Sequence, residues 1–142
     1  MILVDANLLI FASNSYFPQH EPAREWIDRQ LSGPVRVGIP WASVMAYLRI
    51  VTNPRVMTRA IGMADAWAQV LGWLASDVVW TPEPTEHHTA TFAKLIQETT
   101  VTANLVSDAH LAALAIEHGL TLCSTDGDLA RFRGLRWQNP IA

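Results

Sequence analysis

The chain opens with Met1-Ile-Leu-Val-Asp5, a short apolar run that ends at a carboxylate. Consecutive large aliphatic residues predict a buried strand at 2–4, and Asp5 stands where that strand would end. In an open parallel sheet, side chains just past the carboxyl ends of neighbouring strands converge on one crevice. The opening segment therefore predicts an α/β fold with an acid at the edge of the sheet where ligands bind.

Two later segments also place an aspartate beside apolar residues. Asn104-Leu-Val-Ser-Asp108 opens a predicted helix, and Leu120-Thr-Leu-Cys-Ser-Thr-Asp126 is an apolar run that leads to an acid. We predict that Asp5, Asp108 and Asp126 share one pocket built from both ends of the chain. Carboxylates crowded together repel each other, and this raises a pKa unless a hard cation such as Mg²⁺ or Mn²⁺ lies between them. The pattern therefore indicates a divalent-cation site.

Each aspartate also has a simpler explanation when it is taken alone. Asp5 is suited to cap a helix, Asp108 is a first-turn acid favoured by the helix dipole, and Asp126-Gly-Asp128 is typical of a turn. A calcium loop is excluded, because no glutamate follows at the required position. An aspartyl-phosphate phosphatase is excluded as well, because too little chain follows Asp128. The combination of the three acids favours the shared pocket.

Length and composition limit the class of protein. The 142 residues suit one domain, half of them are apolar, and 16% are charged, which indicates a packed core. The single Cys123 excludes an intramolecular disulfide and suits a small buried residue in a reducing compartment. No apolar stretch is long enough to cross a membrane, and the N-terminus lacks the basic region of a secretory signal. We expect a cytoplasmic protein without membrane contact.

Charge is distributed unevenly along the chain. The net charge of −3 argues against binding nucleic acid through bulk positive charge. Nine of the ten basic residues are arginines, whose planar fork suits phosphate, although solvated faces and ion pairs are the simpler use of each one. Two clusters stand out in the sequence: Arg49, Arg55 and Arg59, and Arg131, Arg133 and Arg136.

Histidines and tryptophans offer further candidates. A zinc site through His87 and His88, or through His110 and His118, is disfavoured, because adjacent residues point to different sides of a helix and His118 suits a helix C-terminus. The six tryptophans are core or interface candidates, since so much aromatic surface is hard to cover in a small domain. They favour a homodimer or a bound partner peptide over stacking on RNA bases.

Periodicity predicts strands that alternate with helices. Strands are expected at 2–4, 35–39, 78–81 and 120–123, with a short one near Arg136 and Trp137. Helices are expected at 7–12, 20–31, 41–51, 63–74, 86–98 with Thr85 as its N-cap, 108–118 and 129–132. Such alternation predicts an α/β fold with a central parallel sheet of four to five strands and helices on both faces.

Four segments together resemble PIN-domain ribonucleases of the VapC toxin type: residues 1–9, 41–55, 104–115 and 124–132. The resemblance covers essentially the whole chain and implies a single three-layer PIN domain over residues 1–142. It also implies metal-dependent endonucleolytic cleavage of RNA. By this resemblance Asp5, Asp108 and Asp126 are catalytic metal ligands, Asp128 is an accompanying ligand, and Arg49 or Arg55 positions phosphate.

One position departs from the family pattern. Many members carry a glutamate in the middle helix, whereas here the aligned residue is Ala46. Mg²⁺ is often held by one or two carboxylates with waters, so the change is compatible with catalysis. It also favours the alternative of a catalytically degenerate PIN domain that binds RNA or an antitoxin. The family further implies a VapB-type antitoxin as partner, with DNA bound only through that antitoxin.

Overall fold

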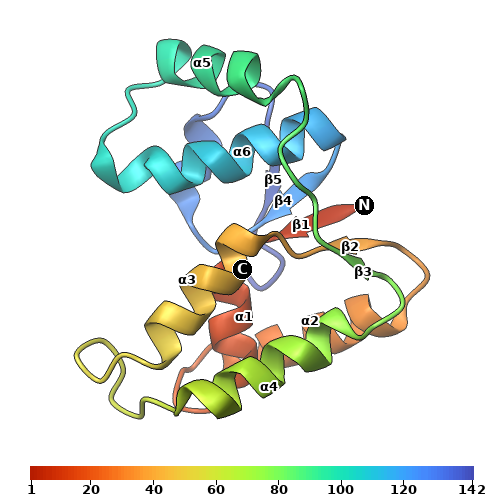
Figure 1. Ribbon diagram of the computed structural model, residues 1–142, viewed down its shortest axis with the longest axis vertical. Coiled ribbons are helices and arrows are strands. Elements are labelled where there is room, and N and C mark those ends of the chain that lie inside the picture. The colour runs from red at the N-terminus through yellow and green to blue at the C-terminus, as the bar shows by residue number, and fades with distance from the viewer.

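A five-stranded sheet lies at the centre of the computed structural model, which describes residues 1–142. All neighbouring strands run parallel, in the order β3-β2-β1-β4-β5 (Figure 1). The strands are short: β1 is Ile2–Val4, β2 is Val37–Gly38, β3 is Val79–Trp80, β4 is Thr121–Cys123 and β5 is Arg136–Gln138. The predicted parallel sheet and its strand number are confirmed.

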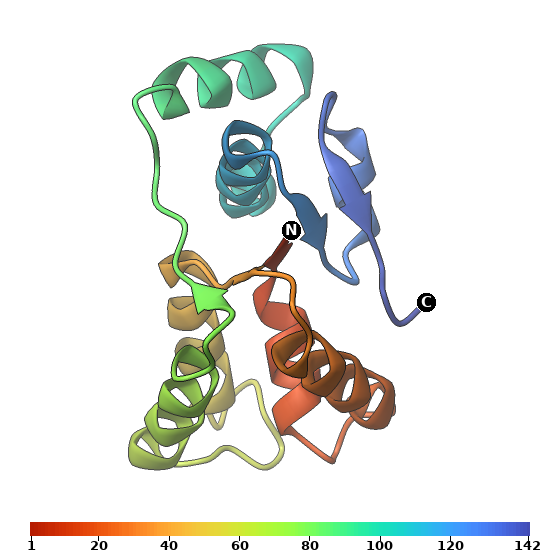
Figure 2. The same ribbon diagram turned by 90° about the vertical axis from the view of Figure 1, so that its right-hand side faces the viewer.

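Helices cover both faces of the sheet, so the predicted three-layer α/β architecture is confirmed (Figure 2). One side carries α1 (Ala6–Ser13), α2 (His20–Ser32), α3 (Trp41–Val51) and α4 (Met63–Leu74). The other carries α5 (His88–Glu98) and α6 (Val106–His118), with 3-10 turns η1 (Ala103–Leu105) and η2 (Gly127–Arg131). None of these helices is both long and apolar enough to cross a lipid bilayer.

Two hydrophobic cores form because successive strand residues point to opposite faces of a sheet. Val4 and Cys123 contribute to the core beneath α1–α4, whereas Leu3 and Leu122 contribute to the core beneath α5 and α6. All four side chains are fully buried. The interpretation of Cys123 as a small core residue is therefore confirmed, and the apolar runs reflect a sheet covered on both sides.

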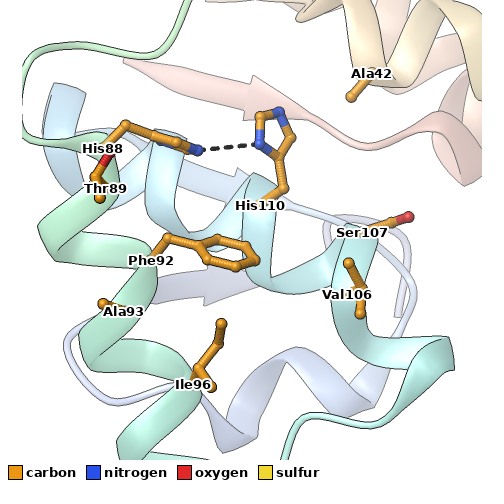
Figure 3. Close-up of a pocket in the computed structure, with 9 residues that line it drawn as sticks. All are labelled: Ala42, His88, Thr89, Phe92, Ala93, Ile96, Val106, Ser107 and His110. Atoms are coloured by element: carbon orange, nitrogen blue, oxygen red, sulfur yellow. Dashed lines mark hydrogen bonds between the residues drawn. The ribbon is translucent and has the colours of Figure 1, made fainter.

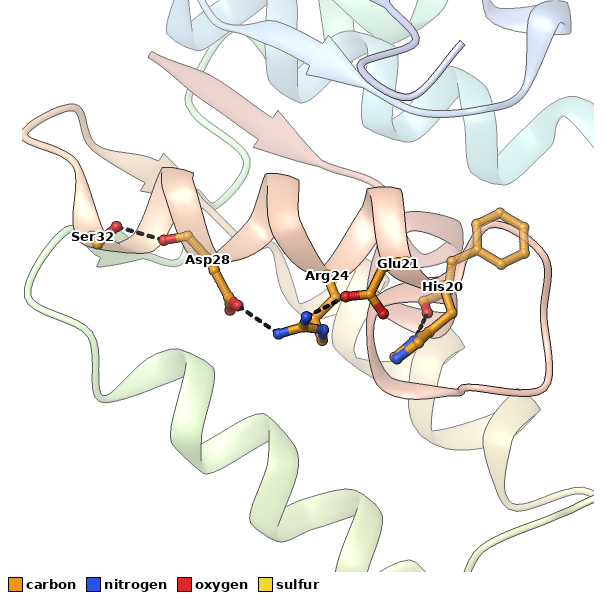
Figure 4. A network of polar contacts seen from close by, with 6 residues as sticks. His20, Glu21, Arg24, Asp28 and Ser32 are labelled. Atoms are coloured by element: carbon orange, nitrogen blue, oxygen red, sulfur yellow. Dashed lines mark hydrogen bonds and ion pairs between the residues drawn. The ribbon is translucent and has the colours of Figure 1, made fainter.

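The exposed side of α2 carries a network of polar contacts (Figure 4). Arg24 contacts Glu21 and lies 3.3 Å from Asp28, one turn away on each side. Nδ1 of His20 donates to the carbonyl oxygen of Phe11 over 2.8 Å and fixes the start of α2 against α1. Exposed ion pairs contribute little to stability, so the two Arg24 pairs add little to the free energy of unfolding.

Several predicted boundaries shift. Helix α5 begins at His88 instead of 86, because a turn in which His88 N–H donates to the carbonyl of Thr85 comes first. Thr85 is therefore not the N-cap, and its hydroxyl accepts from the His87 amide within that turn. Helix α6 begins two residues before Asp108, strand β2 is shorter than predicted, and the last helix is a 3-10 turn.

The tryptophans divide between core and surface. Trp26 and Trp73 are buried, whereas Trp41 and Trp67 remain 43% and 38% exposed. Met45 and Leu71 on the same two helices, α3 and α4, are also exposed. The sequence did not distinguish core from interface tryptophans; the structure buries Trp26 and Trp73 and leaves Trp41 on α3 and Trp67 on α4 exposed.

Candidate active site

The predicted acidic residues follow adjacent strands at the centre of the sheet. Asp5 comes directly after β1 and Asp126 comes shortly after β4, and these strands pair so that Val4 lies beside Cys123. From β1 the chain builds the sheet to one side through β2 and β3, and then returns to place β4 on the other side. Such a reversal opens a crevice at the carboxyl ends of the strands, where α/β proteins bind ligands.

Hydrogen bonds hold the Asp5 carboxylate in place. Its Oδ1 accepts from the amide of Ala6 over 2.7 Å, as an N-cap of α1, and its Oδ2 accepts from the hydroxyl of Ser124 over 2.7 Å. The Asp5 amide donates to the carbonyl oxygen of Cys123 over 3.0 Å. The helix-cap interpretation of Asp5 is correct, but the same carboxylate also joins the two ends of the chain.

Asn7 and Ser124 are site residues that the sequence analysis missed. The Asn7 amide donates to the Ser124 hydroxyl over 2.9 Å, and its Oδ1 accepts from the Thr125 amide. Ser124 is fully buried, and its oxygen also accepts from the Asp126 amide over 3.1 Å. Their signal in the sequence is polarity at otherwise apolar positions: Asn7 interrupts the apolar start of α1, and Ser124 ends an apolar strand.

Asp108 reaches the same crevice from the first turn of α6. Partial burial, reinforced by the negative charges of Asp126 and Asp5, raises the pKa of Asp108 from its ordinary value of 3.8 to about 6. Burial also raises the pKa of Asp5, against the lowering effect of the hydrogen bonds from Ser124 and Ala6. These mutual effects show that Asp5, Asp108 and Asp126 lie close enough to repel one another, as predicted.

Asp126 and Asp128 occupy the turn that leads into η2. Oδ1 of Asp126 accepts from the Asp128 amide over 2.9 Å, and so the turn interpretation of this segment is also correct. Asp128 is exposed, lies 3.6 Å from Arg131, and has the smallest effect among the acids that raise the pKa of Asp108. Asp128 is therefore at the rim of the acidic group.

A cleft of about 310 Å³ opens beside Asp5 and Asp108. Helix α3 forms its opposite wall, where Ala46 stands at the position that the family pattern gives to glutamate, and Arg49 lies one turn further along. Arg55 is exposed in the turn after α3 and does not line this cleft. Of the two candidate phosphate-binding arginines, the structure brings only Arg49 to the acidic residues.

The donor atoms of the site suit a hard cation. Carboxylate oxygens from Asp5, Asp108 and Asp126 are the ligands preferred by Mg²⁺ and Mn²⁺, and no thiolate or imidazole lies among the residues lining the cleft. No set of three or more such side chains is arranged to enclose an ion by itself. Mg²⁺ fits this arrangement because it keeps several waters, which would complete its coordination beside the carboxylates.

Comparison with known proteins decides the family. The PIN domain family model matches residues 2–135. Ribonuclease VapC37 of Mycobacterium tuberculosis is 40% identical over 142 residues, covering 100% of this chain and 99% of the relative. The chain belongs to the VapC family of PIN-domain ribonuclease toxins. The resemblance stated from four sequence segments is thereby confirmed.

Solved structures of the VapC family share the fold. VapBC2 from Rickettsia felis, bound to a DNA fragment from its promoter, gives a TM-score of 0.72 at 14% identity over 98% of both chains. VapC20 of M. tuberculosis, a toxin that cleaves the sarcin-ricin loop, gives a TM-score of 0.68 at 18% identity over 96% of this chain and 99% of that chain. The VapC fold is therefore retained while most of the sequence changes.

Proposed function

We propose that this VapC-type ribonuclease is an endoribonuclease that depends on Mg²⁺ or Mn²⁺, with Asp5, Asp108 and Asp126 as its catalytic metal ligands and Asp128 as an accompanying ligand. The observation that carries the proposal is the convergence of three carboxylates at the crevice between β1 and β4. A divalent cation bound there would lower the pKa of a coordinated water and neutralise charge on the scissile phosphate.

The chain's own residues prepare this site in distinct ways. Ser124 and the Ala6 amide hold the Asp5 carboxylate in one orientation, so little reorganisation is needed when a ligand arrives. Burial and the negative charges of Asp126 and Asp5 raise the pKa of Asp108 to about 6, and a bound cation would favour its ionised form. Arg49 on the opposite wall offers a guanidinium to a phosphate oxygen, whereas Arg55 does not line the cleft.

Cleavage of total RNA by the purified protein, freed of any antitoxin, tests the proposal. We expect cutting with Mg²⁺ or Mn²⁺ and none with EDTA. Asp5→Ala and Asp108→Asn should each lower the rate by more than about 100-fold, since even residues that only orient metal ligands typically contribute about 10- to 100-fold. Asp77→Asn is the matched control, because Asp77 is an exposed carboxylate away from the cleft.

Circular dichroism and thermal unfolding of each variant must show an intact fold before the rates are compared. Cleavage that persists in EDTA, or in well-folded Asp5→Ala and Asp108→Asn, would refute the metal-dependent mechanism. Equal loss of activity in Asp77→Asn would attribute the effect to general destabilisation of the protein.

We further propose a cytoplasmic, single-domain toxin that forms a homodimer and is held by a VapB-type antitoxin. Exposed Trp41 and Met45 on α3, with Trp67 and Leu71 on α4, offer apolar surface for these partners. The structural relatives from R. felis and Salmonella typhimurium are VapBC complexes bound to DNA. We propose that DNA reaches this protein in the same way, only through the antitoxin.

A second candidate function rests on Ala46. The cleft wall carries a methyl group where many family members have a carboxylate, and this favours a degenerate domain that binds RNA or antitoxin without cutting. The same cleavage experiment separates the two candidates. Measurable binding of Mn²⁺ without cleavage of any RNA would favour the degenerate domain, whereas metal-dependent cutting would exclude it.

A further inference from the structure

A second cavity, of about 600 Å³, lies beside the acidic cleft between α5 and α6 (Figure 3). Phe92 and Ile96 of α5 and Val106 of α6 give it apolar walls. Ala42 and Ser107 line both this cavity and the acidic cleft, so the two spaces adjoin. A polymer whose backbone lies in the cleft therefore passes the mouth of the cavity, and we call this space the α5–α6 pocket.

His88 and His110 form a polar wall of the α5–α6 pocket, and a buried carboxylate accepts a hydrogen bond from His88. The side chain of Glu117 is only 1% exposed, and its Oε2 accepts from Nδ1 of His88 over 3.0 Å. Its Oε1 accepts from the Thr85 amide over 2.9 Å. Nε2 of His88 in turn lies 3.2 Å from Nδ1 of His110. Hydrogen bonds therefore connect Glu117 of α6 to His88 of α5, and His88 to His110 of α6.

This chain of contacts fixes the histidine rings. A carboxylate only accepts, so Nδ1 of His88 carries a proton, and with both rings neutral its Nε2 accepts from Nδ1–H of His110. The second ring nitrogen of His110, which points away from His88 in Figure 3, is then left as a hydrogen-bond acceptor. The hydrogen bonds therefore fix the orientation of the His88 and His110 rings that line the pocket.

The lining identifies the kind of ligand that fits. No carboxylate, ammonium or guanidinium lines the α5–α6 pocket, so it holds no permanently charged group that would favour a phosphate over a neutral ligand. The rings of His88 and Phe92 lie 6.1 Å apart with a tilt of 30° and present aromatic surface to a flat group. Unstacked bases of single-stranded RNA bind to proteins in this way, by stacking on aromatic side chains and by hydrogen bonds at their edges.

We propose that the α5–α6 pocket binds one nucleobase of the RNA substrate, next to the phosphate that is cut in the acidic cleft. The proposal rests on the ribonuclease function proposed above and adds a contact that selects where along a strand the cut falls. Continuity with the cleft through Ala42 and Ser107 favours a base of the same strand over an antitoxin segment or a second copy of the chain.

An abasic scan tests the pocket. The cleavage site is first mapped in total RNA, and a short synthetic RNA containing it is then prepared with each flanking base removed in turn. For the wild type, one abasic position should lower kcat/KM by about tenfold, the usual effect of losing one stacked base. Phe92→Leu, which keeps apolar volume but removes the ring, should cut the intact RNA about tenfold more slowly and be insensitive to that abasic position.

A second variant protects the test against a folding defect. Ala93 is exposed on the rim of the pocket, so Ala93→Leu narrows the space without removing a core contact, and it should act like Phe92→Leu. Lys94→Ala is the control on the outer face of α5, where the Lys94 side chain is 72% exposed. It should retain the full difference between intact and abasic RNA.

The alternatives give different results. Equal cleavage of intact and abasic RNAs by the wild type would overturn the pocket while leaving the ribonuclease function standing. The base-binding proposal would also be overturned if Phe92→Leu and Ala93→Leu left RNA cleavage unchanged. A change only in the molar mass from light scattering would then indicate a second copy of the chain in the pocket, and a change only in inhibition by the antitoxin would indicate an antitoxin segment. If the wild type cut no RNA at all, the proposed ribonuclease function would fail. The pocket can still be tested by binding, and equal affinity for labelled hexaribonucleotides with and without bases would overturn the base-binding proposal.

Discussion

Replacing Asp108 by asparagine should stabilise the metal-free protein at neutral pH even as it removes activity. Burial and the neighbouring charges of Asp126 and Asp5 oppose ionisation of Asp108 in the folded state, so its pKa rises from 3.8 to about 6. The gap between these pKa values corresponds to an upper limit of about 3 kcal/mol. Asp108 is partly exposed to solvent, and screening reduces the expected gain to about 1–2 kcal/mol.

The pH dependence follows from which state holds the proton. Between about pH 4 and pH 6 the folded state retains a proton on Asp108 that the unfolded state releases, so stability falls as the pH rises. Above about pH 6 the penalty is constant. The advantage of Asp108→Asn over the wild type should therefore be small near pH 4, grow through this window, and stay level at pH 7.

Urea unfolding followed by tryptophan fluorescence in EDTA, at a series of pH values from 4.5 to 7.5, measures this difference. Asp77→Asn, a change at an exposed carboxylate, should leave stability nearly unaltered. Adding Mg²⁺ should stabilise the wild type and leave the stability of Asp108→Asn unchanged, because only the folded wild type should bind the cation. An Asp108→Asn protein no more stable than the wild type at pH 7 in EDTA would refute the electrostatic account of the pocket.

Four other substitutions probe features of the fold and the site. Ala46→Glu should tighten Mn²⁺ binding about tenfold in calorimetry, because affinity rises with the number of charged ligands; unchanged affinity would mean that position 46 does not reach the cation. Ser124→Ala removes the hydroxyl that contacts Asp5, Asn7 and Asp126, and it should slow cleavage by about 10- to 100-fold while the protein remains folded. Gly38→Ala would place a Cβ 2.8 Å from Pro82 and 3.1 Å from a backbone oxygen of the adjacent strand, and should cost about 1–3 kcal/mol in thermal unfolding. Gly72→Ala in α4 meets nothing within 4 Å and should instead stabilise the helix by about 0.5–1 kcal/mol.

Much of the fold was predictable because local patterns and tertiary structure agree. The helix at 41–51 begins after Pro40 and ends before Asn53-Pro54, and both of its predicted bounds match α3. The start of α5 was not predictable from local signals. Thr85 is an acceptable N-cap residue, but Glu117, far along the chain, binds the Thr85 amide and His88, and the helix begins only at His88.

The site divides in a similar way. Asp5, Asp108 and Asp126 were predicted because acids beside apolar runs are conspicuous, and parallel strands bring such positions together. Ser124 was missed because a serine after a strand is common, and only its contacts with three partners give it a role. The link between His88 and His110 was missed because the sequence analysis paired His88 with His87 and His110 with His118, and His87 and His118 make other contacts.

The pairing of β1 with β4 has a consequence for the time at which the enzyme becomes active. Asp5 and Ser124, which share a hydrogen bond, are 119 residues apart. At synthesis rates of about 5–20 residues per second, roughly 6–24 s pass between their translation. The acidic crevice is therefore incomplete on the ribosome until the last strands emerge. A chain interrupted before β4 lacks Asp126 and the partner of Asp5, and under the proposed mechanism it would become competent only when its synthesis is nearly finished.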